Sequence, residues 1–128
     1  MLRNHRSTDP YNEAMAYTVD RGGGTFHAET CIPFEPIAGY AVAVGGVILD
    51  PAITGSFRFR NAWKHVASEF MTLFVGTWLD GDNLYVDAVR YFGPEWRDEA
   101  IALGREHNQL AIYDFAAGES ITLVDPEA

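Results

Sequence analysis

Three side chains that can bind a metal ion fall within residues 25–33, which read TFHAETCIP. His27-Ala28-Glu29 has the form of the zinc-deaminase signature, in which the histidine binds zinc and the glutamate moves the proton. Cys31 follows two residues later, but the Pro-Cys-x-x-Cys half of that signature is absent, and Cys31 is the only cysteine. The stretch therefore predicts neither a zinc deaminase nor any other zinc site that needs two thiolates.

The same stretch alternates polar and apolar residues in the manner of a β-strand, with Pro33 ending it. On a strand, His27, Glu29 and Cys31 project from one face, yet side chains four residues apart lie about 13 Å from each other. One ion would reach all three only across a sharp bend. We therefore interpret residues 25–32 as an amphipathic edge strand without a metal, and an incidental or interface metal site is the alternative.

Two other chemical signatures are incomplete. Asp80, Asp82 and Asn83 resemble the start of a calcium loop, but the closing glutamate of the twelve-residue pattern is missing. We interpret these residues as a hairpin turn. The Gly-x-Ser-x-Gly elbow of many serine hydrolases is also absent from the sequence.

A single carboxylate, Asp87, interrupts the otherwise apolar strand pattern LYVDAVRYF. It shares a strand face with Tyr85, Val89 and Tyr91. It is a buried general acid, an outward residue of a solvated sheet face, or a cross-strand partner of Arg90, and we favour the two structural interpretations. The alternative function is a small enzyme with a dispersed active site, built from His27, Glu29, Asp87 and Tyr85.

Composition limits the class of protein. The chain has 128 residues, of which 48% are hydrophobic, so it is long enough to bury a core as one domain without a metal or a disulfide. Nine basic residues stand against eighteen acidic ones, which disfavours binding to nucleic acid phosphates. No signal peptide and no membrane-spanning run is visible. We expect a cytoplasmic protein without a cofactor.

The hydrophobic periodicity predicts alternating strands and helices. The strongest signals are an amphipathic helix over residues 56–70, starting at a capping Ser56, and a hairpin of two strands joined by DGDN. The full set of expected elements comprises strands over 25–32, 40–49, 71–79, 84–92 and 110–115, helices over 56–70 and 95–107, and a short edge strand over 121–124. We expect a bulge or bend at Gly45-Gly46.

These elements predict an α+β fold. Residues 1–21 lack periodicity and are expected to form a flexible N-terminal arm, and residues 22–128 a single α+β domain. The domain is expected to be an antiparallel sheet of about five strands with two helices on one face. From residue 40 onward, the order strand, helix, strand, strand, helix, strand is that of the ferredoxin-like split βαβ pattern, with the N-terminal strand added at an edge.

The predicted hairpin is rich in aromatic residues. Two helices cannot cover both of its faces, and large exposed apolar patches mark interfaces. We therefore expect a binding surface for a partner protein, or for a second copy in a homodimer, built from Phe74, Trp78, Tyr85 and Tyr91.

Several stretches resemble a group of small proteins encoded by actinobacterial phages and prophages. They are FVGTWLDGDNLYVDAVRYF, RDEAIALGREHNQLAIYDFAAGESI and, earlier, GGGTFHAETCIPFEPIAGYAVAV, which together span roughly residues 22 to 122. The group has no assigned activity, so the resemblance assigns no residue a role. It implies a phage or prophage accessory protein that acts in the host cytoplasm. Because no catalytic motif is complete, we favour a non-enzymatic protein that binds a host or phage protein.

Overall fold

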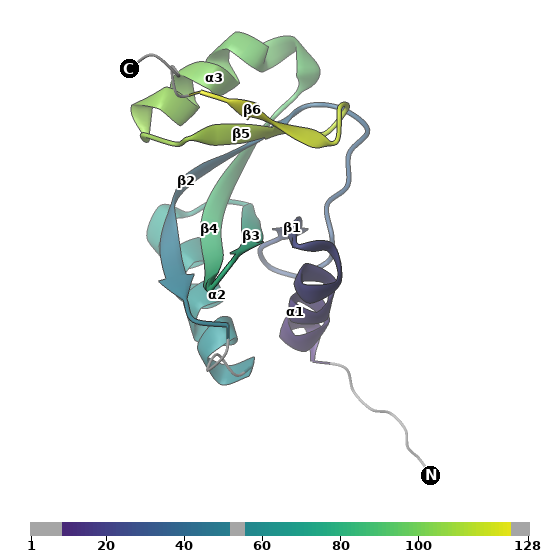
Figure 1. Cartoon of the computed structure of the whole chain (residues 1–128), viewed down its shortest axis with the longest axis vertical. Helices are drawn as coiled ribbons and strands as arrows, with labels where there is room; N and C mark the ends of the chain where they lie inside the picture. Colours follow the sequence, from purple (N-terminus) through teal and green to yellow (C-terminus); the bar gives the residue numbers. More distant parts are fainter. Residues whose placement is uncertain (1–8, 52–55, 124–128) are drawn as a thin grey trace.

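The fold is a curled antiparallel sheet with helices against it, seen in a computed structural model that describes residues 9–51 and 56–123 (Figure 1). The strands are β1 (Gly23–His27), β2 (Tyr40–Leu49), β3 (Phe74–Asp80), β4 (Asn83–Phe92), β5 (Ala111–Asp114) and β6 (Glu119–Thr122). The helices are α1 (Pro10–Arg21), α2 (Ser56–Phe70) and α3 (Arg97–Glu106), and a 3-10 turn, η1 (Pro94–Trp96), precedes α3. The α+β class is confirmed.

All neighbouring strands are antiparallel, in the order β1-β3-β4-β2-β5-β6. The described part of the chain thus has six strands and three α-helices, where about five and two were expected. The expected edge position of β1 is confirmed. The short edge strand expected over residues 121–124 is present as β6, at Glu119–Thr122. The sheet curls into a half-barrel and takes a third helix, so it is not a clear ferredoxin-like sheet.

Helix α1 corrects the prediction of a flexible arm for residues 10–21. Its first turn is capped by Asp9, whose side chain accepts a hydrogen bond of 2.9 Å from the Tyr11 amide, and Gly22 ends it with a left-handed φ of 85°. Thr18 is buried and its hydroxyl lies 2.6 Å from that of Thr77 on β3. Only two residues of α1 are fully buried, Ala14 and Thr18, so the sequence of this helix shows little apolar periodicity. Residues 1–8 lie outside the described part.

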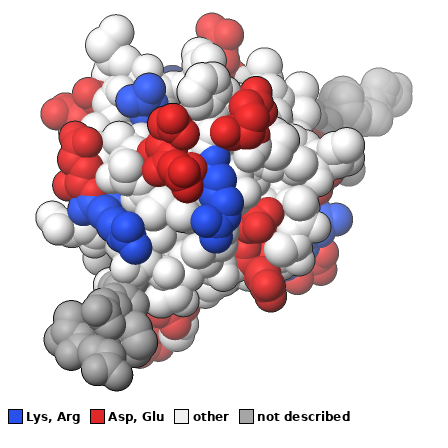
Figure 2. Space-filling view, turned by 90° about the horizontal axis from the view of Figure 1, so that it is seen from above, with Lys and Arg blue, Asp and Glu red and all other residues white. Residues whose placement is uncertain are grey.

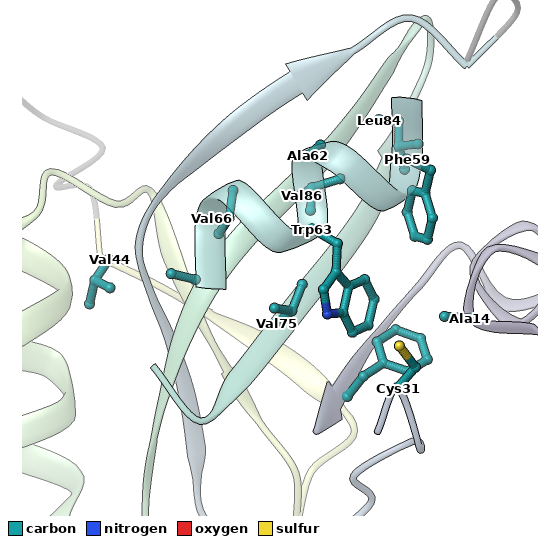
Figure 3. Close-up of a cluster of buried hydrophobic side chains, with 12 residues drawn as sticks. Ala14, Cys31, Val44, Phe59, Ala62, Trp63, Val66, Val75, Leu84 and Val86 are labelled. Atoms are coloured by element: carbon teal, nitrogen blue, oxygen red, sulfur yellow. The ribbon is translucent and has the colours of Figure 1, made fainter. Parts of the chain in front are cut away.

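Helix α2 confirms the predicted amphipathic stripe. Phe59, Trp63 and Val66 are almost completely buried and project from α2 into the main core (Figure 3). The Trp63 ring contacts the rings of Tyr11, Phe26 and Phe59 at centroid distances of 5.8, 5.4 and 5.8 Å. Its indole N–H donates a 2.8 Å hydrogen bond to the Ala28 carbonyl. Trp63 thus joins α1, α2 and the end of β1. The expected cap at Ser56 lies outside the described side chains.

Helix α3 covers the other end of the same sheet face. It packs on β2 and β5 over a second core that contains Val42, Ala100 and Ile112. Gly104 permits this approach, because a Cβ there would lie 2.5 Å from Leu123. The predicted helix over 95–107 is therefore present, with its first turn tightened into η1.

The predicted hairpin and bulge are both confirmed. Strands β3 and β4 pair from Phe74↔Val89 to Asp80↔Asn83, and Gly81 (φ 60°) and Asp82 form the turn. The register between β2 and β4 shifts between Ala43 and Gly45. The shift fixes which β2 residues face the helices and which face away.

Candidate binding face of the sheet

One face of the sheet is covered by α1, α2 and α3, and the candidate site lies on the opposite face. Along β4, the core residues Leu84, Val86 and Ala88 alternate with Tyr85, Asp87 and Val89, which point away from the helices. The pairing of β3 with β4 places Phe74 and Trp78 on this second face as well. The four residues predicted for binding therefore share one face: Phe74, Trp78, Tyr85 and Tyr91.

The register arranges this face in rows that run across three strands. Ile48, Tyr85 and Trp78 form one row, which we call the open row. Ile48 is 58% and Trp78 53% exposed, and Tyr85 lies half-buried between them. The open row is thus a continuous set of large side chains in contact with solvent.

In the next row, Asp87 is the only side chain contributed by β2, β3 and β4, and Thr25 of the edge strand β1 follows beyond Gly76. Asp87 pairs with Gly46 on β2 and with Gly76 on β3, and we call this the glycine row. A Cβ at Gly46 would lie 2.2 Å from the Asp87 Oδ1, so the carboxylate lies over that glycine. A Cβ at Gly76 would lie 2.8 Å from Val89. The close packing at both positions requires glycine.

The rest of the face is covered by the segment between β1 and β2. Phe34 stacks on Phe74 at 4.4 Å and meets the edge of Tyr91 at 5.0 Å and of Phe115 at 6.0 Å. The Tyr91 hydroxyl donates a 2.6 Å hydrogen bond to the Ala38 carbonyl. Two of the four predicted binding residues, Phe74 and Tyr91, thus belong to an aromatic cluster with Phe34, in which both are half-buried. Trp78 is exposed, and Tyr85 is half-buried outside that cluster.

Asp87 is half-buried and lacks a partner. Within residues 9–51 and 56–123, no hydrogen bond or ion pair to its carboxylate is present. Burial raises the pKa of its carboxyl from the ordinary 3.8 to about 6. The predicted alternative of a pair with Arg90 is wrong, because Arg90 lies on the helix-covered face, where its guanidinium is 6.0 Å from the Phe92 ring.

The strand predicted over residues 25–32 continues only to His27, which corrects the prediction for this segment. A turn follows, in which the Cys31 amide donates to the His27 carbonyl at 2.8 Å and Cys31 has a φ of 63°. The His27 ring contacts Phe34 and Phe74 on the candidate face of the sheet, whereas Cys31 is buried in the main core on the helix side. Burial raises the pKa of the Cys31 thiol to about 11, so the thiol is neutral and unreactive.

The three candidate metal ligands, His27, Glu29 and Cys31, therefore point in different directions. Glu29 lines a small pocket with Tyr11, Trp63 and Lys64, on the helix side. A search of residues 9–51 and 56–123 finds no group of three or more metal-binding side chains. Of the residues of the alternative active site, the structure brings Tyr85 and Asp87 together but not Glu29.

We predict that purified protein contains no stoichiometric zinc, because His27, Glu29 and Cys31 do not converge. His27→Ala should leave the unfolding transition within about 0.5 kcal/mol of the wild type, as is usual for an exposed position. Elemental analysis checks the first statement and urea unfolding the second. About one zinc per chain, lost in His27→Ala, would show that the side chains rearrange around a metal.

The charge of the chain is spread over its surface. Figure 2 shows Asp and Glu side chains interspersed with Lys and Arg at the end of the molecule that carries α3, which includes Asp98, Glu99 and Arg105. By contrast, the strand residues described on the candidate face include two carboxylates: Asp87, between the open row and the aromatic cluster, and Asp80, which is exposed at the end of β3 beyond Trp78. Among the strand residues described on that face there is no Lys or Arg.

The chain matches no protein-family model, no curated protein and no solved structure. Of the helices in the described ranges, none is long and apolar enough to span a membrane.

Proposed function

We propose that the chain is a non-enzymatic binding protein that engages a partner protein through the open row of Ile48, Tyr85 and Trp78. The observation that carries this proposal is the exposure of a tryptophan and an isoleucine, at 53% and 58%, side by side with a tyrosine on a sheet face that none of the described helices covers. Tryptophan and tyrosine supply much of the binding energy at protein interfaces. A phage or prophage accessory protein that binds a host or phage protein in the cytoplasm fits this chemistry.

A matched pair of tryptophans tests the proposal. Trp78 lies in the open row, and Trp96, exposed to a similar 51%, lies in η1 at the other end of the molecule. Trp78→Ala is expected to weaken binding to the partner at least about tenfold, because a tryptophan at the centre of an interface contributes about 2 kcal/mol or more. Trp96→Ala should bind as the wild type does. The measurement is affinity capture from actinobacterial lysate with each tagged variant, followed by titration of the captured protein.

Circular dichroism must show that each variant is folded, because the Trp78 ring also lies against Gly23 of β1. If a protein is captured equally by the wild type and Trp78→Ala but is lost with Trp96→Ala, the binding surface lies at η1 and the proposal is wrong.

A further inference from the structure

The glycine row gives the proposed interface a chemical preference. Asp87 lies between two strands that have no side chain in its row, since its neighbours are Gly46 and Gly76. The open row borders it on one side, at the spacing of diagonal neighbours, about 7 Å, which long side chains span. A side chain from outside that lies on the open row therefore reaches the carboxylate.

The surroundings of the Asp87 carboxylate within the described residues do not compensate for its partial loss of hydration. The carboxylate is half-buried, no donor within the described ranges bonds to it, and its closest neighbours along β4 are Tyr85 and Val89. A carboxylate that has lost part of its hydration recovers the loss when it pairs with a charged hydrogen-bond donor. A cation supplies that donor, whereas a second carboxylate or an aliphatic group does not.

We propose, as an extension of the proposed function, that the partner contributes a basic side chain, arginine or lysine, which pairs with Asp87 while apolar residues next to it pack on Ile48, Tyr85 and Trp78. The aromatic faces of Trp78 and Tyr85 attract the same cation. No Lys or Arg among the described strand residues of this face competes for the carboxylate. The net charge of −9 attracts basic segments at longer range.

Two short peptides test the preference without knowledge of the partner. The first is N-acetyl-Leu-Arg-Leu-amide, and the second replaces the arginine with citrulline, a neutral residue of nearly the same shape. In ¹H–¹⁵N spectra of the whole chain, the arginine peptide is expected to shift the amides of Gly46, Gly76 and Asp87 and the indole N–H of Trp78. We expect a dissociation constant of about 1 mM, as for a single small contact, and binding of the citrulline peptide at least about fivefold weaker.

Asp87→Asn should remove the difference between the two peptides, because it removes the charge and keeps the shape. Asp82→Asn makes the same change of charge in the exposed hairpin turn and should preserve the difference. Equal binding of both peptides to the wild type would overturn the basic-residue proposal and leave the open row as an apolar interface. Absence of shifts with either peptide at about ten times that concentration would overturn it as well.

A second copy of the chain is the competing occupant of this face. Sedimentation of the wild type and Trp78→Ala at high micromolar concentration distinguishes it. A dimer of the wild type that Trp78→Ala converts to monomer would assign the face to self-association and overturn the proposal. A monomer in both cases, together with selective binding of the arginine peptide, supports it.

Discussion

Replacing Trp63 with alanine is expected to lower the free energy of unfolding by about 4 kcal/mol, since removal of a buried large aromatic side chain costs about 3–5 kcal/mol. Trp63 is 1% exposed and contacts the rings of Tyr11, Phe26 and Phe59. The change leaves a cavity where α1, α2 and β1 meet, and it removes the donor to the Ala28 carbonyl. Urea unfolding followed by circular dichroism measures the loss.

Two further variants separate the causes of this loss. Trp63→Phe retains much of the packing but leaves the Ala28 carbonyl without its donor, so a loss of about 1–2 kcal/mol is expected. Lys64→Ala changes the adjacent, exposed residue and should alter stability by less than about 0.5 kcal/mol. A loss below about 2 kcal/mol for Trp63→Ala would mean that the three elements do not depend on this side chain, in conflict with the core described above.

The sequence predicts the elements whose signal is local. The apolar stripe of α2 repeats from Phe59 to Phe70, and the hairpin has a turn at Gly81 and Asp82 between two runs of β-forming residues. Helix α1 escapes prediction because its stability comes from contacts with distant residues, such as the bond between Thr18 and Thr77. The end of β1 at His27 escapes for a similar reason, since the turn after it is fixed by Trp63 bonding to Ala28.

The candidate site is predictable only in part. The period of two along a strand places Tyr85, Asp87 and Tyr91 on one face, and the hairpin adds Trp78. The glycine row requires the register of β2 against β4, which depends on the bulge beside Ala43 and cannot be read from local spacing. The signals of the row that are visible in the sequence are Gly46, at the predicted bend, and Gly76, between Phe74 and Trp78.

The covering of Phe74 and Tyr91 was not predictable either. Phe34 lies in a segment without regular periodicity, yet it stacks on Phe74 and contacts Tyr91, so it covers part of the expected aromatic surface. The effect is to confine the accessible part of the face to the open row and the glycine row. The carboxylate in these two rows belongs to Asp87, so its contribution to stability and binding is the next property to test.

Replacing Asp87 with asparagine is expected to stabilise the isolated protein at neutral and alkaline pH. Burial raises the pKa of this carboxyl from 3.8 to about 6, which means that the fold disfavours the charged form. Each unit of pKa difference corresponds to about 1.4 kcal/mol, so the charge lowers the stability of the wild type by about 2–3 kcal/mol above pH 7. Asparagine has the same shape without the charge.

The pH dependence of the stability difference between Asp87→Asn and the wild type distinguishes the effect of the buried charge from a general packing effect. Between pH 4 and pH 6 the folded wild type retains a proton that the unfolded chain has released, so its stability falls as the pH rises through this range. The advantage of Asp87→Asn is therefore expected to be near zero at about pH 4, to grow up to about pH 6–7 and to remain constant above that. The titratable groups on this face of the described strands near Asp87 are Asp80, Tyr85, Tyr91 and His27. Both proteins share them, so their contributions cancel in the difference. Urea unfolding at several pH values measures the difference, with Asp82→Asn as the matched control for a change of charge in an exposed turn.

An Asp87→Asn protein that is less stable than the wild type at pH 8 would show that the carboxylate has a stabilising partner within the fold. The proposed pairing with an external basic side chain would then lose its physical basis.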